Sequence, residues 1–421
     1  MSTAIFVVVV AVAYIALGGI SSALDTTPST DAWTVWLASG PVLGLLLACR
    51  RESRAAILGG AALGAAIFNV LLGDPQPLDA IGYAAIEVLA ALAGMVVFGW
   101  LSPLPTRLER SRDLAALLVG ALAMSVVGAL LAAAWTAAAG TDMPARTFRV
   151  WTISSLVGTI VMAPLVIAWT GFRVKRSGGL TMTEFAAGAI AALLFFVTLR
   201  FLFGAGVLGG LGGPGGHGPT YLPVMFMALI ALLWGARGAT LVAFAATLLA
   251  LYYTMTGRGP FAKSEGFLGN PELEVQGYTA TIALTGLLVA VLEAGQRRAM
   301  LVARDWRTRF EAAIGAHRLV AYEWDPSSGA FAVTGDTRPL LAIAPESIAS
   351  LADWLAHVAP DERDRVSTAF GLRADGEPGA PITYRVTRPD GEVATLTDEA
   401  RAIRDHDGAL HRITGIIHVA A

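Results

Sequence analysis

Few side chains in this sequence could bind a ligand or exchange a proton, and three of them interrupt long apolar runs. Asn69, Glu87 and Arg200 each stand among residues that are almost all apolar. Ionisable groups in such surroundings cost on the order of 2.5–3.5 kcal/mol on membrane-insertion scales, so each needs a compensating role. Glu87 could pair with Arg200 or accept a hydrogen bond from Asn69, either in a ligand-sensing site or in an interhelical hydrogen bond. Arg200 could instead extend to the polar end of its own helix.

The elements that must position these residues are membrane-spanning helices. Of the 421 residues, 55% are hydrophobic and only 15% are charged, whereas a soluble globular chain is nearer one quarter charged. A spanning helix needs about 20 mostly apolar residues. Ten runs qualify, at 3–23, 32–50, 55–73, 80–101, 114–139, 149–170, 182–203, 221–237, 238–256 and 275–296. The boundary between the eighth and ninth runs is only the short stretch Gly235-Ala236-Arg237-Gly238, so eight or nine spans are the alternative.

The first run has a second interpretation as a signal peptide. It ends in Ser21-Ser22-Ala23, which could be a cleavage site, but residues 1–5 contain no Lys or Arg. We therefore expect this run to remain as a span.

The basic residues between the spans predict the orientation in the membrane. With a cytoplasmic N-terminus, the inner connections hold thirteen Lys and Arg residues and the outer connections hold only four: Arg146, Arg149, Arg258 and Lys263. Cytoplasmic connections of membrane proteins carry an excess of basic residues. We therefore expect a multi-pass protein of the bacterial inner membrane with both termini in the cytoplasm.

Charge density changes near residue 297. Residues 1–296 carry 15 Lys and Arg and 14 Asp and Glu, whereas the last 125 residues carry 15 and 18. We therefore expect an integral membrane domain over 1–296, a connecting helix over 297–317 and a soluble domain over 318–421. Residues 293–314 contain no Pro, so the last span should continue as a helix, and a pair of such helices could form a homodimer.

The soluble part has the periodicity of an α+β domain. Residues 319–324 and 330–334 alternate as strands, 349–357 and 361–370 are patterned as helices, and three further strands follow up to Val419. Turns at Pro389-Asp390-Gly391 and Asp405-His406-Asp407-Gly408 join the last three strands as hairpins. The prediction is a five-stranded antiparallel sheet.

Several function classes lack support. The net charge is −2 and no basic stripe is present, which argues against a nucleic-acid partner. One cysteine, Cys49, allows no cysteine-based metal cluster, and His217 in the glycine-rich stretch 203–219 is a weak metal candidate by itself. No Walker motif, kinase histidine box or cyclase signature is present, so we expect no enzyme activity in this chain.

Four stretches together resemble a bacterial membrane-associated sensor domain of the MASE class, first type. They are Trp36-Leu37-Ala38-Ser39-Gly40, Ile86-Glu87-Val88-Leu89, Trp151 with Gly158 and Ala163-Pro164-Leu165, and Gly257-Arg258-Gly259-Pro260-Phe261. Leu37 stands where that family usually has Pro. The resemblance implies a signal-receiving module attached to a histidine kinase or diguanylate cyclase output. The ligand-sensing candidates are Trp36, Asn69, Glu87, Trp151, Arg200 and Arg258.

The soluble part resembles a PAS domain. Trp324-Asp325 and Tyr384-Arg385-Val386 with Arg388-Pro389-Asp390-Gly391 are similar to its strand and hairpin motifs, although the usual His-Pro-Asp-Asp-Arg reads Ala359-Pro360-Asp361-Glu362-Arg363. PAS domains can hold flavin or haem. Because no cysteine follows Cys49 and His357 is a lone candidate for haem, we expect no bound cofactor.

The sequence thus predicts a membrane signal sensor that lies in the lipid bilayer, receives a small ligand or membrane signal and relays it through the PAS domain to an output module. That module could lie in a longer form of the chain or in a kinase or cyclase partner. The alternative is a small-solute transporter with a regulatory cytoplasmic domain.

Overall fold

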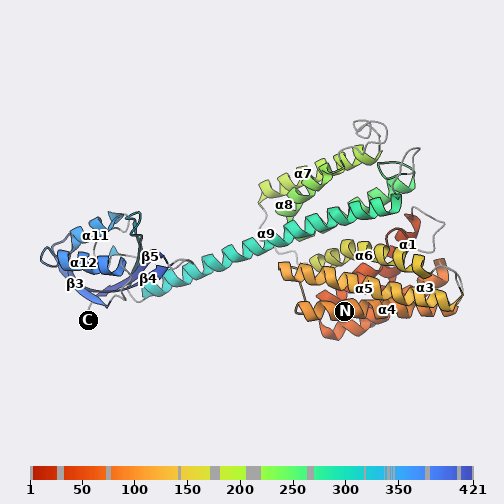
Figure 1. The fold of residues 1–421 in the computed structure, drawn as a ribbon, viewed down its shortest axis with the longest axis horizontal. Coiled ribbons are helices and arrows are strands. Elements are labelled where there is room, and N and C mark those ends of the chain that lie inside the picture. Colours follow the sequence, from red (N-terminus) through yellow and green to blue (C-terminus); the bar gives the residue numbers. More distant parts are fainter. Residues whose placement is uncertain are drawn as a thin grey trace. The chain divides into compact units, whose positions relative to one another are not determined.

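The computed structural model describes residues 3–25, 33–72, 77–140, 144–170, 181–204, 220–262, 270–316, 319–335, 337–338, 342, 344, 347–374, 380–404 and 409–419. It divides into two compact units, Met1–Arg298 and Ala299–Ala421, which are considered separately (Figure 1). The predicted loop with His217 and the predicted turn at 405–408 lie outside the described residues.

The first unit is a bundle of apolar helices. These are α1 (Thr3–Ala23), α2 (Ser39–Ala48), α3 (Arg54–Leu72), α4 (Pro77–Leu101), α5 (Ser111–Ala138), α6 (Pro144–Trp169), α7 (Met182–Gly204), α8 (Leu222–Met255) and α9 (Pro271–Ala316), with a short 3-10 helix, η1 (Arg51–Ser53), between α2 and α3. Within the described ranges, eight of these helices are long and apolar enough to cross a membrane, and α2 is a shorter apolar helix. The predicted polytopic bundle is confirmed.

Two differences from the predicted spans concern helix ends. Of the predicted span 32–50, only Ser39–Ala48 is helical, and residues 33–38 are extended or bent because their backbone groups bond to neighbouring elements. The predicted eighth and ninth spans correspond to the two arms of α8. Gly235, whose φ of 63° and ψ of −160° are not helical, separates these arms. Glycine adopts a positive φ without the steric cost that other residues meet, and the two arms of α8 therefore meet at this residue.

Glycines allow neighbouring helices to approach closely, and the order of these contacts shows which helices run parallel. A Cβ on Gly60 would meet Val10 and one on Gly64 would meet Tyr14, so α3 runs parallel to α1. A Cβ on Gly44 would lie 2.8 Å from the carbonyl oxygen of Ala163, and α2 likewise runs parallel to α6. Close backbone approach of this kind is typical of helix packing in membranes, where the lipid is as apolar as the side chains.

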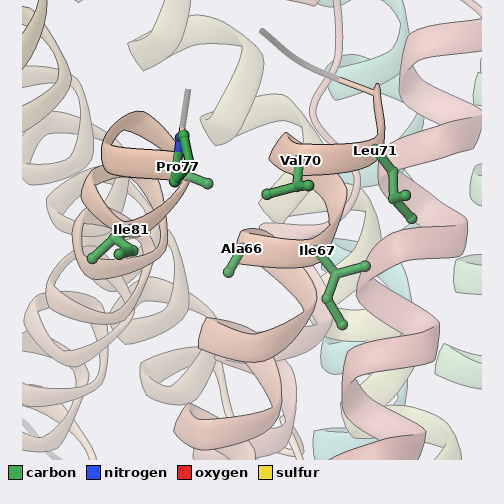
Figure 2. Close-up of a pocket in the computed structure, with 7 residues that line it drawn as sticks. Ala66, Ile67, Val70, Leu71, Pro77 and Ile81 are labelled. Carbon is green, nitrogen blue, oxygen red and sulfur yellow. The ribbon is translucent and has the colours of Figure 1, made fainter. Parts of the chain in front are cut away.

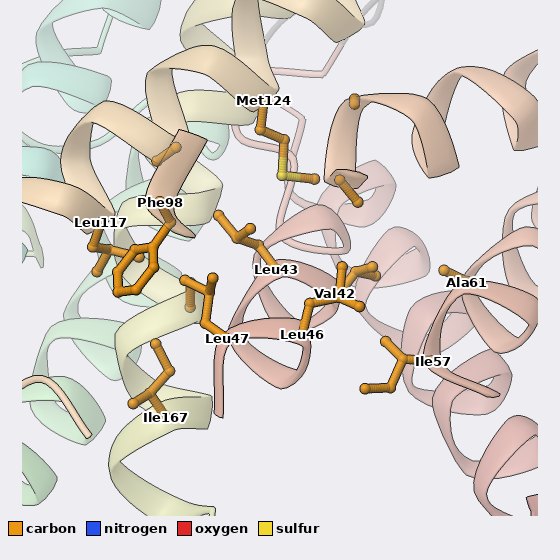
Figure 3. Close-up of a cluster of buried hydrophobic side chains, with 14 of the residues drawn as sticks. Val42, Leu43, Leu46, Leu47, Ile57, Ala61, Phe98, Leu117, Met124 and Ile167 are labelled. Atoms are coloured by element: carbon orange, nitrogen blue, oxygen red, sulfur yellow. The ribbon is translucent and has the colours of Figure 1, made fainter. Parts of the chain in front are cut away.

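Two apolar clusters hold the bundle together. The first surrounds α2, whose Val42, Leu43, Leu46 and Leu47 contact side chains from α3, α4, α5 and α6 (Figure 3). The second joins α6, α7, α8 and α9 around residues such as Phe195, Met227 and Ile282. The segment 33–38 contributes to both clusters.

The second unit contains the end of α9 and an antiparallel sheet of five strands. The strands are β1 (Val320–Trp324), β2 (Phe331–Thr334), β3 (Ile382–Thr387), β4 (Val393–Arg404) and β5 (Leu410–Val419), in the order β2-β1-β5-β4-β3. Two helices, α11 (Leu351–His357) and α12 (Arg363–Ala374), lie between β2 and β3 in sequence. The predicted order of two strands, helices and three strands is confirmed.

The core of this unit packs both helices onto one face of the sheet. Trp354 of α11 and Phe370 of α12 are fully buried against Phe331, Tyr322 and Tyr384 of the strands. A capping box opens α11, in which the Ser350 side chain accepts from the Asp353 N–H and the Asp353 carboxylate accepts from the Ser350 N–H. This arrangement supplies donors and acceptors that the first helical turn otherwise lacks.

Candidate functional site

Glu87 on α4 is a carboxylate in the interior of the helical bundle. Its exposed fraction is 4%, and its Oε2 accepts a hydrogen bond of 2.9 Å from the Ser39 hydroxyl at the start of α2. The other oxygen, Oε1, is buried and has no hydrogen-bond partner in the described part of the chain. Tyr14 of α1 interacts electrostatically with the same carboxylate. Because an unsatisfied buried oxygen is costly, Oε1 can accept a proton or a donor group of a ligand.

The extended segment 33–38 places Ser39 against Glu87. The N–H of Trp36 donates to the Ser154 carbonyl on α6 at 3.2 Å, and the N–H of Leu37 donates to the Ser21 hydroxyl on α1 at 3.0 Å. A Cβ on Gly158 would lie 1.8 Å from the Trp36 carbonyl oxygen, so only glycine allows α6 to approach this segment so closely. Backbone groups that no helix satisfies are thus bonded by two neighbouring helices.

The side chains of this segment alternate between the two apolar clusters. Trp36 and Ala38 belong to the cluster around α2, whereas Val35 and Leu37 belong to the cluster of α6–α9. Trp33 also packs against the cluster around α2, and bends at residues 34, 35 and 38 direct neighbouring side chains to different clusters. The segment therefore lies between the two halves of the bundle and contacts both.

Trp36 belongs to a buried aromatic cluster. Its ring stacks on Trp33 at a centroid distance of 4.4 Å and meets Phe68 of α3 edge-on at 5.3 Å and Tyr14 at 6.0 Å. Tyr14 connects this cluster to Glu87, so the structure brings Trp36 and Glu87 into one site. Trp36 is 8% exposed and does not have the position of an interfacial tryptophan.

The extended segment also bonds directly to α9. The Gln276 side-chain amide donates to the Thr34 carbonyl oxygen, and both residues are buried. Thr34 in turn donates to the Asp25 carboxylate beyond the end of α1, at 2.8 Å from its hydroxyl. The same short segment therefore contacts Glu87 through Ser39 and α9 through Thr34.

Trp151 of α6 contacts Tyr83, which lies one helical turn before Glu87 on α4. It stacks on Tyr83 with a centroid distance of 5.8 Å and an interplanar angle of 16°. Tyr83 precedes Glu87 by four positions on α4, and residues so spaced share a helix face. Trp151 thus borders the Glu87 site through Tyr83.

Asn69 does not contact Glu87. Its side-chain amide donates to the Ala65 carbonyl of its own helix at 2.8 Å. It is close in sequence to an apolar groove of about 440 Å³ between α3 and α4, which is lined by Ala66, Ile67, Val70, Leu71, Pro77, Ala80 and Ile81 (Figure 2). The possible hydrogen bond from Asn69 to Glu87 is therefore not formed, and a carbonyl one turn back in the same helix accepts from the amide instead.

Arg200 and Arg258 lie together at Tyr253, apart from the Glu87 site. The Arg200 guanidinium is 5.8 Å from the centroid of the Tyr253 ring, and the Arg258 N–H donates to the Tyr253 carbonyl at 2.8 Å. Both side chains are exposed. Of the possibilities that the sequence left open for Arg200, the ion pair with Glu87 is not formed, and the exposed guanidinium lies over an aromatic ring.

The loop Gly257–Phe261 docks on the ends of α7 and α9. Gly259 has a φ of 87°, and a Cβ there would meet the Phe203 ring at 2.7 Å. Phe261 is buried, with its ring 5.6 Å from Phe203 and 5.4 Å from Tyr278 of α9. The loop completes a second aromatic cluster, and its backbone needs glycine at Gly259.

Three residues of the Glu87 site were not predicted from the sequence. Gln276 was detectable, since it is an amide in an otherwise apolar span. Ser39 belonged to the stretch Trp36-Leu37-Ala38-Ser39-Gly40 that carried the family resemblance, whereas Tyr14 carried no signal because tyrosines are common in spans. No group of three or more His, Cys, Asp or Glu side chains that could hold a metal occurs among the residues with described placement.

The second unit has a buried polar network in its core. Arg373 of α12 and Asp398 of β4 form an ion pair of 3.2 Å, with side chains 3% and 0% exposed. The Tyr322 hydroxyl donates to Asp398 at 3.0 Å, and the Tyr384 hydroxyl donates at 3.3 Å. Trp354 Nε1 donates to the Tyr384 oxygen at 3.1 Å. These bonds link both helices to three strands.

Burial sets the protonation of this network. It raises the pKa of Asp398, while the Arg373 charge lowers it. Burial also raises the pKa of Tyr322 and of Tyr384, and the Asp398 charge adds to the effect. Both phenols therefore stay protonated at neutral pH and act as donors. An acidic ligand in this core would have to compete with Asp398 for Arg373.

The first unit is thus a multi-pass helical membrane protein, and the second is a sheet of PAS topology. The MASE1 family matches residues 3–297, and the PAS fold matches residues 333–417. The chain belongs to the MASE1 family. A MASE1 region followed by a PAS fold supports a role as a signalling sensor.

Solved structures are similar to about a quarter of the chain. One is the N-terminal domain of a diguanylate cyclase with PAS/PAC sensor from Marinobacter aquaeolei, at 19% identity, covering 24% of this chain and 94% of that chain with a TM-score of 0.23. Another is a sensory box histidine kinase/response regulator from Burkholderia thailandensis, at 19% identity, 27% and 84% coverage and a TM-score of 0.23. No curated protein matches the chain.

Proposed function

We propose that this protein senses a small polar ligand or a proton at Glu87 and transmits the change through α9 to the PAS domain. The observation that carries the proposal is the extended segment 33–38, which is bonded to Glu87 through Ser39 and to α9 through Thr34. A ligand that binds Oε1 of Glu87 would change the charge or the hydrogen bonding beside Ser39. The conformation of the bundle that binds the ligand more tightly would then become more populated.

The continuity of α9 supports transmission. This helix extends over 46 residues from Pro271, close to Gln276, to Ala316, without interruption. A helix of this length spans about 69 Å at 1.5 Å per residue. A displacement at Gln276 therefore reaches the stretch that precedes β1 through covalent and backbone hydrogen bonds alone.

A comparison of two variants in the full chain tests this transmission. Glu87→Gln imitates the protonated carboxyl, and Gln276→Leu removes the bond to Thr34. We expect Glu87→Gln to change amide exchange in residues 276–316, and Gln276→Leu to abolish that change when the two are combined. Identical exchange in wild type and Glu87→Gln would refute the coupling. Arg258→Gln, which is exposed and distant from Glu87, is the control.

The proposal includes an orientation in the inner membrane with both termini in the cytoplasm. Its support is the gathering of basic residues at one end of the bundle, where Arg298 pairs with Glu109, and Arg237 bonds to the Ala168 carbonyl at the end of α6. In a Cys49→Ser background, Arg258→Cys should react with an impermeant maleimide on intact cells and Arg107→Cys only after lysis. The reverse labelling would overturn this orientation.

The role of the PAS domain in this proposal is to present the change to a kinase or cyclase output, with the chain acting as a homodimer and catalysing no reaction itself. Full-length protein purified from its native membrane should be dimeric and should retain such an output protein. Substrate uptake by reconstituted vesicles would instead support a transporter.

A further inference from the structure

A second site lies at the basic end of the bundle, where η1 meets the connection between α4 and α5. A pocket of about 480 Å³ is lined there by Arg50, Arg51, Glu52, Arg54, Gly99, Leu104 and Pro105. The N–H of Thr106 donates to the Leu47 carbonyl at 2.9 Å, which fastens the wall of this pocket to the end of α2. The pocket is therefore formed by packed elements.

The charges of this pocket are not compensated within the described residues. Three arginines face one carboxylate, and neither Arg50, Arg51, Arg54 nor Glu52 forms an ion pair with any residue of the described ranges. The Nε of Arg54 is buried and has no hydrogen-bond partner there. At the same end of the bundle, Arg298 in contrast pairs with Glu109. A buried guanidinium donor without an acceptor is costly, and an anion would remove that cost.

The backbone adds to the positive potential. Arg54 is the first residue of α3, and the first turn of this helix contains no acidic residue. The 3-10 helix η1 leads directly into α3, and the Arg54 N–H donates to the Arg51 carbonyl, so this helix start contributes only its partial positive charge. The pocket thus combines guanidinium groups with a helix terminus.

Neighbouring side chains place the pocket at a lipid surface. Trp100, next to the pocket residue Gly99, is 77% exposed, and Leu101 is 39% exposed at the end of α4. Exposed Trp at the end of a spanning helix is typical of the level of the lipid headgroups. A lipid headgroup at this level is therefore within reach of the pocket.

We propose that Arg50, Arg51 and Arg54 bind the phosphate of an anionic phospholipid, with its acyl chains along the exposed apolar end of α4. Basic pockets among spanning helices bind acidic headgroups in this way, at about 1 kcal/mol for each basic residue near the surface. This site is separate from Glu87 and does not depend on the sensing role.

The test uses delipidated full-length protein in a neutral detergent and native mass spectrometry to titrate phosphatidylglycerol, phosphatidylcholine and inorganic phosphate. Wild-type protein should retain phosphatidylglycerol in preference to phosphatidylcholine. Arg50→Gln/Arg51→Gln alters two exposed side chains and should weaken phosphatidylglycerol binding roughly tenfold to thirtyfold. Arg146→Gln/Arg149→Gln, which removes two arginines from the start of α6, should leave it unchanged.

Three results would overturn the proposal. They are equal binding of the two lipids, an unchanged phosphatidylglycerol affinity in Arg50→Gln/Arg51→Gln, and equal competition by inorganic phosphate at the same concentration, which would identify a site for soluble phosphate. Arg54→Gln, which removes the buried Nε that lacks a hydrogen-bond partner in the described residues, should reduce phosphatidylglycerol binding by itself. Circular dichroism of each variant separates loss of binding from loss of fold.

Discussion

Ser39 donates a hydrogen bond of 2.9 Å to Glu87 across 48 positions of sequence. The bond joins the first residue of α2 to the middle of α4. It supplies one donor to a buried carboxylate whose other oxygen has none among the described residues.

Replacing Ser39 by Ala should therefore destabilise the bundle. Removing a donor from a buried charged group costs about 1–3 kcal/mol. The measurement is the free energy of unfolding in a denaturing-detergent titration. Thr247→Val is the control, because the Thr247 hydroxyl bonds only to Ala243 of its own helix. Equal stability of Ser39→Ala and wild type would show that the bond contributes nothing.

The close approach of α6 to the extended segment should make Gly158 intolerant of any side chain. The added methyl of Gly158→Ala would lie 1.8 Å from the Trp36 carbonyl oxygen, so the segment or α6 must move. We expect a loss of several kcal/mol in stability or of folded protein, seen in size-exclusion chromatography. Gly59→Ala on α3 is the matched control, since a Cβ there meets nothing within 4 Å. Its stability should equal or slightly exceed that of wild type.

Removing one partner of the Arg373–Asp398 ion pair should destabilise the PAS core more than replacing both partners together. Leaving either charge alone in the PAS core is expected to cost about 3–5 kcal/mol, whereas two apolar residues need no partner. Arg373→Met/Asp398→Leu should therefore be more stable than Arg373→Met or Asp398→Leu. Amide exchange of β4 and β5 in the full chain measures these differences. Additive losses in the double variant would contradict this prediction.

The capping box of α11 should make this helix sensitive to acid. The Ser350 hydroxyl, bonded to the Asp353 carboxylate, is the main cause that lowers the pKa of Asp353 below its usual 3.8. A lowered pKa contributes stability that is complete above about pH 4 and is lost as the pH falls through the shifted value. Ser350→Ala should reduce protection of residues 351–357 above pH 4 and flatten its pH dependence below. Unchanged exchange would exclude this role.

The PAS strands could be predicted from sequence within one or two residues, because each has a period of two and ends at a turn. The first strand was expected at 319–324, and β1 extends over Val320–Trp324. Apolar runs likewise located the helices of the bundle. Both features are local, so a single sequence contains them.

The contacts of the site depended on information that periodicity lacks. Glu87 was identified as a charge within a span, and Ser39 as part of a motif, but neither periodicity nor the motif indicated that the two side chains are bonded. The helical interpretation of residues 33–38 was wrong because tertiary hydrogen bonds from Ser21, Ser154 and Gln276 replace those of a helix. Such replacement is visible only once the chain is folded.

The alternation of side chains along residues 33–38 has a mechanical consequence. Val35 and Leu37 belong to one apolar cluster, and Trp36 and Ala38 belong to the other, so this strip of backbone is a shared wall. A shift of the wall that tightens packing on one side opens space on the other. The packing of the two apolar clusters is therefore coupled. A movement of this segment that compresses one cluster loosens the other.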